Sequence, residues 1–231
     1  MTSLDLLSPS VSGEYRSKCD LNLFNAVECK ELATQAAKRR HFKVLTTTVT
    51  EKAVQVRLCE DGYIAWLPLS EISQLEPAET AYQPNSLSRD EIELRLPEII
   101  AFTKAAMEQP NYYLWGGTIG PNYDCSGLMQ KAFAMSGIWL PRDSYQQEDF
   151  TQRIDKNDLL PGDLIFFGEQ KVNHVALYLG DGYYIHSSGK EQGRNGIAID
   201  VFSNQGDEVS RRYYNKFWSC GRVIKSYADC R

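Results

Sequence analysis

The sequence predicts an α+β protein built from two successive units. Residues 14–76 contain short runs rich in β-branched residues, which are typical of strands. Helical patterns begin at Ser88 and after Cys125, separated by a loop with Gly116, Gly117, Gly120 and Pro121, and residues 163–224 return to strand-like runs. Helices followed by a run of antiparallel strands are typical of the α+β class. We therefore expect helices packed on an antiparallel sheet in the second unit, preceded by a smaller strand-rich unit.

The strand-rich unit is expected at residues 13–76, after a flexible lead-in at residues 1–12. The polar stretch of residues 28–40 has a composition that favours a helix. A unit of this size fits a small barrel of about five strands. Its clearest strand candidates are residues 42–49, 53–58 and 63–67, the last of which (YIAWL) alternates as a half-buried strand does.

Residues 77–87 are expected to link the two units, because they contain proline and little apolar periodicity. The second unit, residues 88–231, opens with a helix whose start is marked by a capping box of Ser88 and Glu91. Pro97 is expected to kink or split that helix. Strand candidates follow at residues 163–167, 174–179, 183–186, 197–202 and 217–224, and residues 180–182 (GDG) predict a hairpin turn between the second and the third.

The composition argues against several classes of protein. The net charge is −5 and the pI about 5.3, whereas a general nucleic-acid binder usually carries a basic surplus. The six cysteines include no pair at CxxC spacing and there are three histidines, so we expect no metal and no other cofactor. The first residues lack the pattern of a signal peptide, and no window has the roughly 20 apolar residues of a membrane span. We therefore expect a cytoplasmic protein with no membrane or nucleic-acid partner; its oligomeric state stays open.

Cys125 stands at the start of a helical pattern, where unpaired backbone N–H groups and the helix dipole favour a thiolate. His174 begins one arm of the predicted hairpin and His186 ends the other, so antiparallel pairing brings the two imidazoles together. This pattern predicts Cys125 as a nucleophile, His174 as the base that accepts its proton, and His186 as the group that fixes the tautomer of that base. A structural cysteine and two solvated histidines would give the same spacing, so spacing alone leaves both interpretations open.

Six short motifs in the second unit, all in the expected order, resemble those of the NlpC-type bacterial cell-wall peptidases, a papain-like family of cysteine peptidases. Residues 113–117 (YLWGG) resemble its Y-x-W-G-G segment, in which we expect Trp115 to be a core residue, and residues 124–127 (DCSG) resemble its nucleophile motif. The other four are residues 141–147 (PRDSYQQ), 161–167 (PGDLIFF), 174–182 (HVALYLGDG) and 185–187 (IHS). The first unit resembles, more loosely, a bacterial SH3-like domain. The resemblance implies a papain-like catalytic domain preceded by an SH3-like β-barrel.

The resemblance also implies a reaction: hydrolysis of the bond between γ-D-glutamate and a diamino acid such as meso-diaminopimelate in cell-wall stem peptides. Cys125 would attack the γ-amide carbonyl and form a thioester, and water activated by His174 would then release the acyl product. The lack of a signal-peptide pattern favours soluble peptides in cell-wall recycling as the substrates. Whether the diamino acid is diaminopimelate or lysine stays open.

Five further residues are candidates for binding the substrate. Asp124 either caps the helix of Cys125 or binds the ammonium group of a free N-terminal L-Ala. Ser126 and Ser144 either cap locally or hydrogen-bond the substrate. Arg142 is a candidate for binding a substrate carboxylate. Tyr63, in the first unit, would close one end of the cleft if that unit packs over it, and would thereby favour short, unlinked peptides.

Two other functions fit parts of the sequence. Related thiol folds include amidases and acyltransferases that act on lipids or other amides, but the complete set of peptidase motifs argues against this alternative. A non-catalytic protein that binds cell-wall peptides is the second alternative. An inert relative would be expected to lack Cys125, His174 or His186, and this sequence has all three.

Overall fold

The computed structural model describes residue 7 and residues 10–228, so the expected lead-in at residues 1–12 lies largely outside the described residues. The chain divides into two compact units, Met1–Pro84 with Ala228–Arg231, and Asn85–Tyr227. The division falls inside the stretch expected to be a linker. Among the described residues, no helix is both long enough and apolar enough to cross a membrane.

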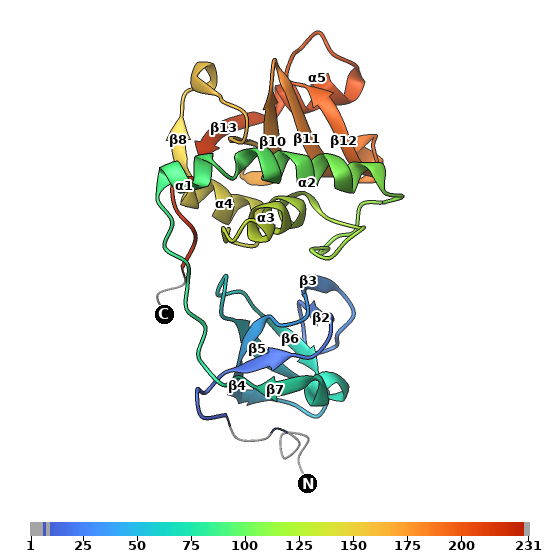
Figure 1. Cartoon of the computed structure of the whole chain (residues 1–231). Helices are drawn as coiled ribbons and strands as arrows, with labels where there is room; N and C mark the ends of the chain where they lie inside the picture. The colour runs from blue at the N-terminus through green and yellow to red at the C-terminus, as the bar shows by residue number, and fades with distance from the viewer. Residues whose placement is uncertain (1–6, 8–9, 229–231) are drawn as a thin grey trace. The chain divides into compact units, whose positions relative to one another are not determined.

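The first unit is an antiparallel sheet with the strand order β3-β2-β6-β5-β4-β1-β7 in its described part (Figure 1). Alternating residues such as Leu21 and Leu23, or Val54 and Val56, are buried in one apolar core. This strand-rich, SH3-like unit is the one that the sequence predicts, with two short strands beyond the expected five. The strands are β1 (Tyr15–Ser17), β2 (Leu21–Phe24), β3 (Leu32–Ala36), β4 (His41–Val49), β5 (Ala53–Leu58), β6 (Ile64–Pro68) and β7 (Leu75–Pro77), with the 3-10 helix η2 (Leu69–Gln74) before β7.

The prediction of a helix within residues 28–40 is wrong, because this stretch contains strand β3. β3 pairs with β2 along its length, and the Gln35 side chain donates a hydrogen bond to Asn22 on β2 at 3.0 Å. Ala33 and Ala36 are buried in the core of the sheet. Alanine, lysine and glutamate give this stretch a helical composition, but pairing with a neighbouring strand overrides such weak local preferences.

The second unit places helices on both faces of a six-stranded sheet with the order β12-β11-β10-β9-β13-β8 in its described part. All of its strand pairs are antiparallel. The helices are α1 (Arg89–Glu93), α2 (Leu96–Glu108), α3 (Cys125–Met135), α4 (Ser144–Phe150) and α5 (Glu208–Asn215), with the 3-10 helices η3 (Lys156–Asp158) and η4 (Lys190–Gln192). The strands are β8 (Gln152–Ile154), β9 (Leu164–Gly168), β10 (Val172–Gly180), β11 (Tyr183–Ser188), β12 (Gly196–Val201) and β13 (Phe217–Arg222).

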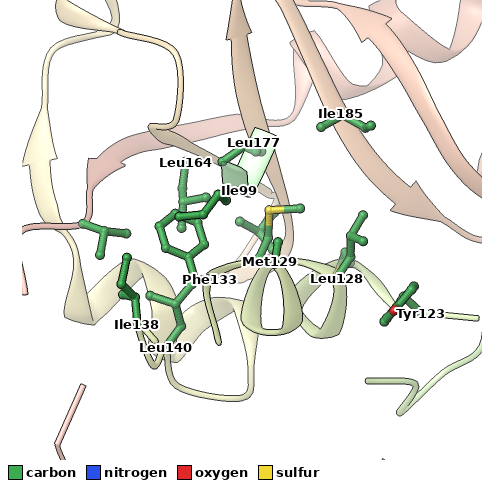
Figure 2. Packing of buried hydrophobic residues seen from close by; sticks show 14 of the residues in the cluster. Ile99, Tyr123, Leu128, Met129, Phe133, Ile138, Leu140, Leu164, Leu177 and Ile185 are labelled. Carbon is green, nitrogen blue, oxygen red and sulfur yellow. The ribbon is translucent and has the colours of Figure 1, made fainter. Parts of the chain in front are cut away.

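Both faces of this sheet are buried, since alternate residues of its strands join different cores. Leu164 and Leu177 pack with Leu128, Met129 and Phe133 of α3 in one core, which Figure 2 shows from close by. A second core, beside α5, collects Ile165, Phe167, Ala176, Tyr184, Phe202, Val209 and Tyr213. Figure 1 shows α2, α3 and α4 on one side of strands β10–β12 and α5 on the other. The sheet thus lies between two layers, which is the mixed α+β layout expected.

Several local predictions for the second unit are confirmed. Ser88 and Glu91 form a complete capping box at the start of α1. Pro97 lies in the first turn of α2, so the predicted helix is split into α1 and α2. The five predicted strands are β9 to β13, and β10 and β11 form the predicted hairpin. Helices α4 and α5 and strand β8 were not predicted, because each is short and carries little apolar periodicity.

Candidate active site

Cys125 is the first residue of α3, as the sequence predicts. Asp124 caps this helix, its Oδ1 accepting the backbone N–H of Gly127 at 2.6 Å. The thiol is buried, and the backbone N–H groups of Val175 and Ser126 form hydrogen bonds with it. Val175 directly follows His174 on β10, so the sulfur lies against the strand that carries the predicted base.

The thiol is held in its neutral form despite its place at a helix N-terminus. Burial raises the pKa of Cys125 to about 12, and the carboxylate of Asp124 adds to the rise. The two backbone N–H groups and Arg142 oppose it only in part. The helix terminus by itself does not produce a thiolate here, so activation requires a base that takes the proton when the sulfur reacts.

Two histidines and an aspartate form a row of hydrogen bonds across three neighbouring strands. His174 Nε2, on β10, lies 2.7 Å from His186 Nδ1, on β11. His186 Nε2 lies 2.8 Å from Asp200 Oδ2, on β12. All three side chains are buried. The predicted proximity of the two histidines is therefore found, whereas Asp200 was missed by the sequence analysis. The one available signal was a lone carboxylate in an otherwise apolar strand, GIAIDV.

Both imidazoles are neutral at neutral pH. Burial lowers the pKa of His174 well below its usual 6.5, and His186 lowers it further, while Asp200 opposes the shift. Burial also lowers the pKa of His186, although its hydrogen bond to Asp200 raises it. The site thus combines a neutral thiol with a neutral imidazole, which can act as a general base.

We expect the unfolding free energy to fall as the pH drops from about 7 to about 5, above the range where carboxylates titrate. In the unfolded chain both histidines take up a proton near pH 6.5, whereas in the folded chain burial keeps them neutral to lower pH. Proton uptake then favours the unfolded state, by up to about 1.4 kcal/mol per pH unit for each histidine. Urea unfolding at several pH values measures this slope. The double variant His174→Gln, His186→Gln should flatten it, and an equal slope in both proteins would contradict the assignment.

Asp124, Ser126 and Arg142 form one buried polar cluster. Arg142 donates to Asp124 Oδ2 at 2.5 Å and Oδ1 at 3.2 Å, and to Ser126 Oγ at 3.0 Å. Asp124 also accepts bonds from Gly127 N, Gly116 N and Ser126 Oγ, so five donors face the roughly four lone-pair sites of a carboxylate. This geometry favours a structural role for Asp124 and Arg142, and their roles in binding a substrate ammonium or carboxylate stay predictions.

The other two predicted substrate-binding residues lie apart in the chain. Ser144 is buried at the first position of α4. Tyr63 belongs to the first unit, in the turn between β5 and β6, where its backbone N–H donates to Asp61 Oδ1 at 3.0 Å. The substrate-binding roles of both residues stay predictions.

A cavity of about 650 Å³ opens beside His174. Trp115 lines it and is 68% exposed, so the expectation of a core position for this residue is wrong. The side chain lines the cavity and is largely open to solvent. The other lining residues include Tyr113, Asn173, Lys190, Glu191, Tyr213 and Lys216. An aromatic wall with charged groups of both signs suits a polar ligand with an apolar stem.

Comparison with known proteins identifies the domains. Residues 110–222 match the model of the NlpC/P60 family, and residues 23–72 match the bacterial dipeptidyl-peptidase SH3 domain. The chain is similar to two proteins named γ-D-glutamyl-L-lysine dipeptidyl-peptidase. That of Bacillus cereus is 45% identical over 84 residues, which is 35% of this chain and 25% of the relative. That of Bacillus subtilis is 40% identical over 95 residues, 39% of this chain and 30% of the relative.

A solved structure of an NlpC/P60 family protein from Bacillus cereus is similar across both units. It shares 25% sequence identity with a TM-score of 0.50, and the match covers 93% of this chain and 65% of that one. The aligned stretch spans only about a quarter to a third of the two curated relatives, so the match identifies domains and not a whole enzyme. The chain therefore carries an NlpC/P60 domain, preceded by a bacterial dipeptidyl-peptidase SH3 domain.

Proposed function

We propose that the chain is a cysteine peptidase that cleaves the bond between γ-D-glutamate and a diamino acid in cell-wall stem peptides. The observation that carries this proposal is the position of the Cys125 sulfur against the strand of His174, whose imidazole is bonded to His186. The names of the two similar dipeptidyl-peptidases support the choice of bond. In this proposal Cys125 is the nucleophile, His174 the general base, and His186 the group that orients it.

The proposed reaction proceeds through a thioester. The Cys125 sulfur attacks the γ-amide carbonyl carbon of D-glutamate while its proton passes to Nδ1 of His174. The backbone N–H groups at the start of α3 stabilise the oxyanion that develops. The carbon–nitrogen bond then breaks, and the amine of the diamino acid leaves with the proton from His174. Water, deprotonated by His174, hydrolyses the thioester, which releases the glutamyl product and restores the thiol.

We further propose meso-diaminopimelate as the diamino acid and soluble peptides with a free N-terminal L-Ala, in cytoplasmic cell-wall recycling, as the substrates. A free amine marks a peptide already released from its sugar. Asp124 is the proposed partner of that amine, although binding would require one of its present donors to yield. Cell fractionation tests the location, and a secreted pool of the protein would contradict the recycling role.

The experiment is mass spectrometry of the purified chain incubated with L-Ala-γ-D-Glu-meso-diaminopimelate. We expect release of L-Ala-D-Glu by the wild type and none by Cys125→Ala. The lysine tripeptide and an N-muramyl tripeptide run in parallel. Cleavage of the lysine peptide alone would correct the choice of diamino acid, and cleavage of the muramyl peptide would remove the free-amine requirement. If the wild type and Cys125→Ala give the same result on all three peptides, the proposed peptidase function is refuted. An amidase or a binding protein is then favoured.

A further inference from the structure

We propose that Asp200 is a positioning residue that determines which nitrogen of His174 accepts the thiol proton. Asp200 does not touch the reacting atoms, and it acts through His186. The kinetic part of this inference rests on the proposed peptidase function, whereas its tautomer part does not.

The row of side chains follows the register of the sheet. Asp200 on β12 is paired with Tyr184 on β11, two residues before His186. Between β11 and β10, Leu177 is paired with Ile185, so the same register sets Ala176 opposite His186. Ala176 lies two residues after His174 on β10. Each step of the row is thus a diagonal between neighbouring strands on one face of the sheet, within the reach of long side chains.

An ionised carboxylate at the end of this row allows one arrangement of protons. Burial raises the pKa of Asp200, but hydrogen bonds from His186 and Arg194 outweigh it and hold the pKa below its ordinary value. A carboxylate only accepts, so His186 donates its Nε2–H and is left with a bare Nδ1. His174 must then donate its Nε2–H to that nitrogen, which leaves Nδ1 of His174 bare. Nδ1 is therefore the nitrogen able to accept the proton of the thiol.

Side chains from outside the hydrogen-bonded row hold Asp200 and the two imidazoles in place. Arg194 donates to both of its oxygens and also to Asp207 Oδ2 at 2.6 Å. Ser210 Oγ, on α5, donates to Asp200 Oδ1 at 3.3 Å. The Tyr213 ring, also on α5, packs against both imidazoles, with ring centroids 4.5 Å from His174 and 4.8 Å from His186. The carboxylate thus keeps both its charge and its orientation, as a tautomer anchor requires.

Asp200→Asn removes the constraint while it keeps the shape of the side chain. An amide offers a donor as well as an acceptor, so His186 is free to bond it in either tautomer, and His174 Nδ1 becomes protonated in part of the population. Such a proton blocks the base. The expected loss is about 10²–10⁴-fold in kcat with a smaller change in KM, the range seen for general bases and for an aspartate-to-asparagine change in a serine peptidase triad.

The pH profile separates this role from a merely structural one. Asp200 raises the pKa values of His174 and His186, so its neutral replacement should move the acid limb of kcat to lower pH. Loosening of the site would instead expose the imidazoles and move that limb upward, toward 6.5. The titratable groups around the two imidazoles are Asp200 on β12, Tyr184 on β11, Arg194 with Asp207 behind it, Tyr213 from α5, and Lys190, Glu191 and Lys216 around the cavity. The Cys125 thiol, bonded by the backbone N–H of Val175, lies against the strand of His174.

Asp163→Asn is the matched control. Asp163 is another buried carboxylate of the same unit, bonded by Arg222 at 2.8 Å and 2.7 Å and remote from the histidine row in the hydrogen-bond network. The corresponding loss of charge there should cost stability without altering either the tautomers or the pH profile.

The deciding measurement is ¹⁵N NMR of the histidine side chains in the wild type, Asp200→Asn and Asp163→Asn, with kcat against pH in the same proteins. We expect His174 of the wild type and of Asp163→Asn to carry its proton on Nε2, and Asp200→Asn to show both tautomers. A His174 that keeps a single Nε2–H tautomer in Asp200→Asn would overturn the inference. If no peptide is cleaved by any protein, the proposed function fails and the NMR result still decides the role of Asp200.

Discussion

Replacing Arg142 by methionine is expected to lower the unfolding free energy of the second unit by about 3–5 kcal/mol. The Arg142 side chain is 2% exposed and its guanidinium forms the ion pair with Asp124, whose side chain is 8% exposed. Methionine preserves much of the volume but leaves a buried carboxylate without its counter-charge, and such a carboxylate is strongly destabilising. Urea unfolding followed by tryptophan fluorescence measures the loss, because three of the four tryptophans, Trp115, Trp139 and Trp218, lie in this unit.

The double variant Arg142→Met, Asp124→Asn is the control for that experiment. With no buried charge left to compensate, it should be more stable than Arg142→Met alone. Such a gain identifies the unpaired charge, and not lost packing, as the cause. If the unfolding free energy of Arg142→Met lies within about 1 kcal/mol of the wild-type value, the Arg142–Asp124 pair contributes no more than an exposed, solvated salt bridge does, and the prediction is contradicted.

Gly127→Ala is expected to abolish most of the activity and to destabilise the fold by about 1–3 kcal/mol, the cost of overpacking a close contact. A Cβ at this position would overlap the backbone carbonyl oxygen of Gly117 and would lie 2.9 Å from Asp124 Oδ1. That carbonyl accepts the backbone N–H of Asp124 at 3.1 Å, so neither partner can move without displacing the residue before Cys125. The start of α3 would then shift relative to His174.

The sign of the change in unfolding free energy caused by Gly127→Ala tests whether the close contact with Gly117 confines the helix start. In an unobstructed helix, exchanging glycine for alanine usually stabilises a protein by about 0.5–1 kcal/mol. Unfolding measurements and the tripeptide assay on the same preparation report both expected losses. A variant that is both more stable and fully active would show that the loop of residues 113–117 does not confine the start of α3.

Strands β9 to β13 and the starts of α1 and α3 could be predicted from the sequence because their signals are local. A capping box needs only Ser88 and Glu91, and the β10–β11 hairpin needs only its turn and two alternating runs. The composition of residues 28–40 was misleading, because pairing with β2 decides the conformation of β3 and pairing is not visible in a local window.

The site was predictable in part for the same reason. Cys125 stands at a recognisable helix start, and His174 and His186 stand on the two arms of a recognisable hairpin, although both lie inside their strands and not at the strand ends that the sequence predicts. Asp200 and the Arg142–Asp124 pair depend on contacts over 14 and 18 residues, for which no spacing rule exists. Their partners are specified by strand order and loop packing, which emerge only when the sheet is assembled.

The diagonal arrangement of His174, His186 and Asp200 sets where this domain tolerates insertions. One added residue inside β11 would turn His186 to the opposite face of the sheet, and two would restore the face but displace it by about 7 Å along the strand. The hairpin turn is different, because it precedes the start of β11 and the space around Gly182 is open, so added residues need not disturb the strand, although the φ of +79° favours glycine at that position itself. Length variation among natural or designed versions should therefore collect at residues 180–182 and be absent between Tyr184 and His186, and peptide tags placed in the turn should leave the histidine row intact.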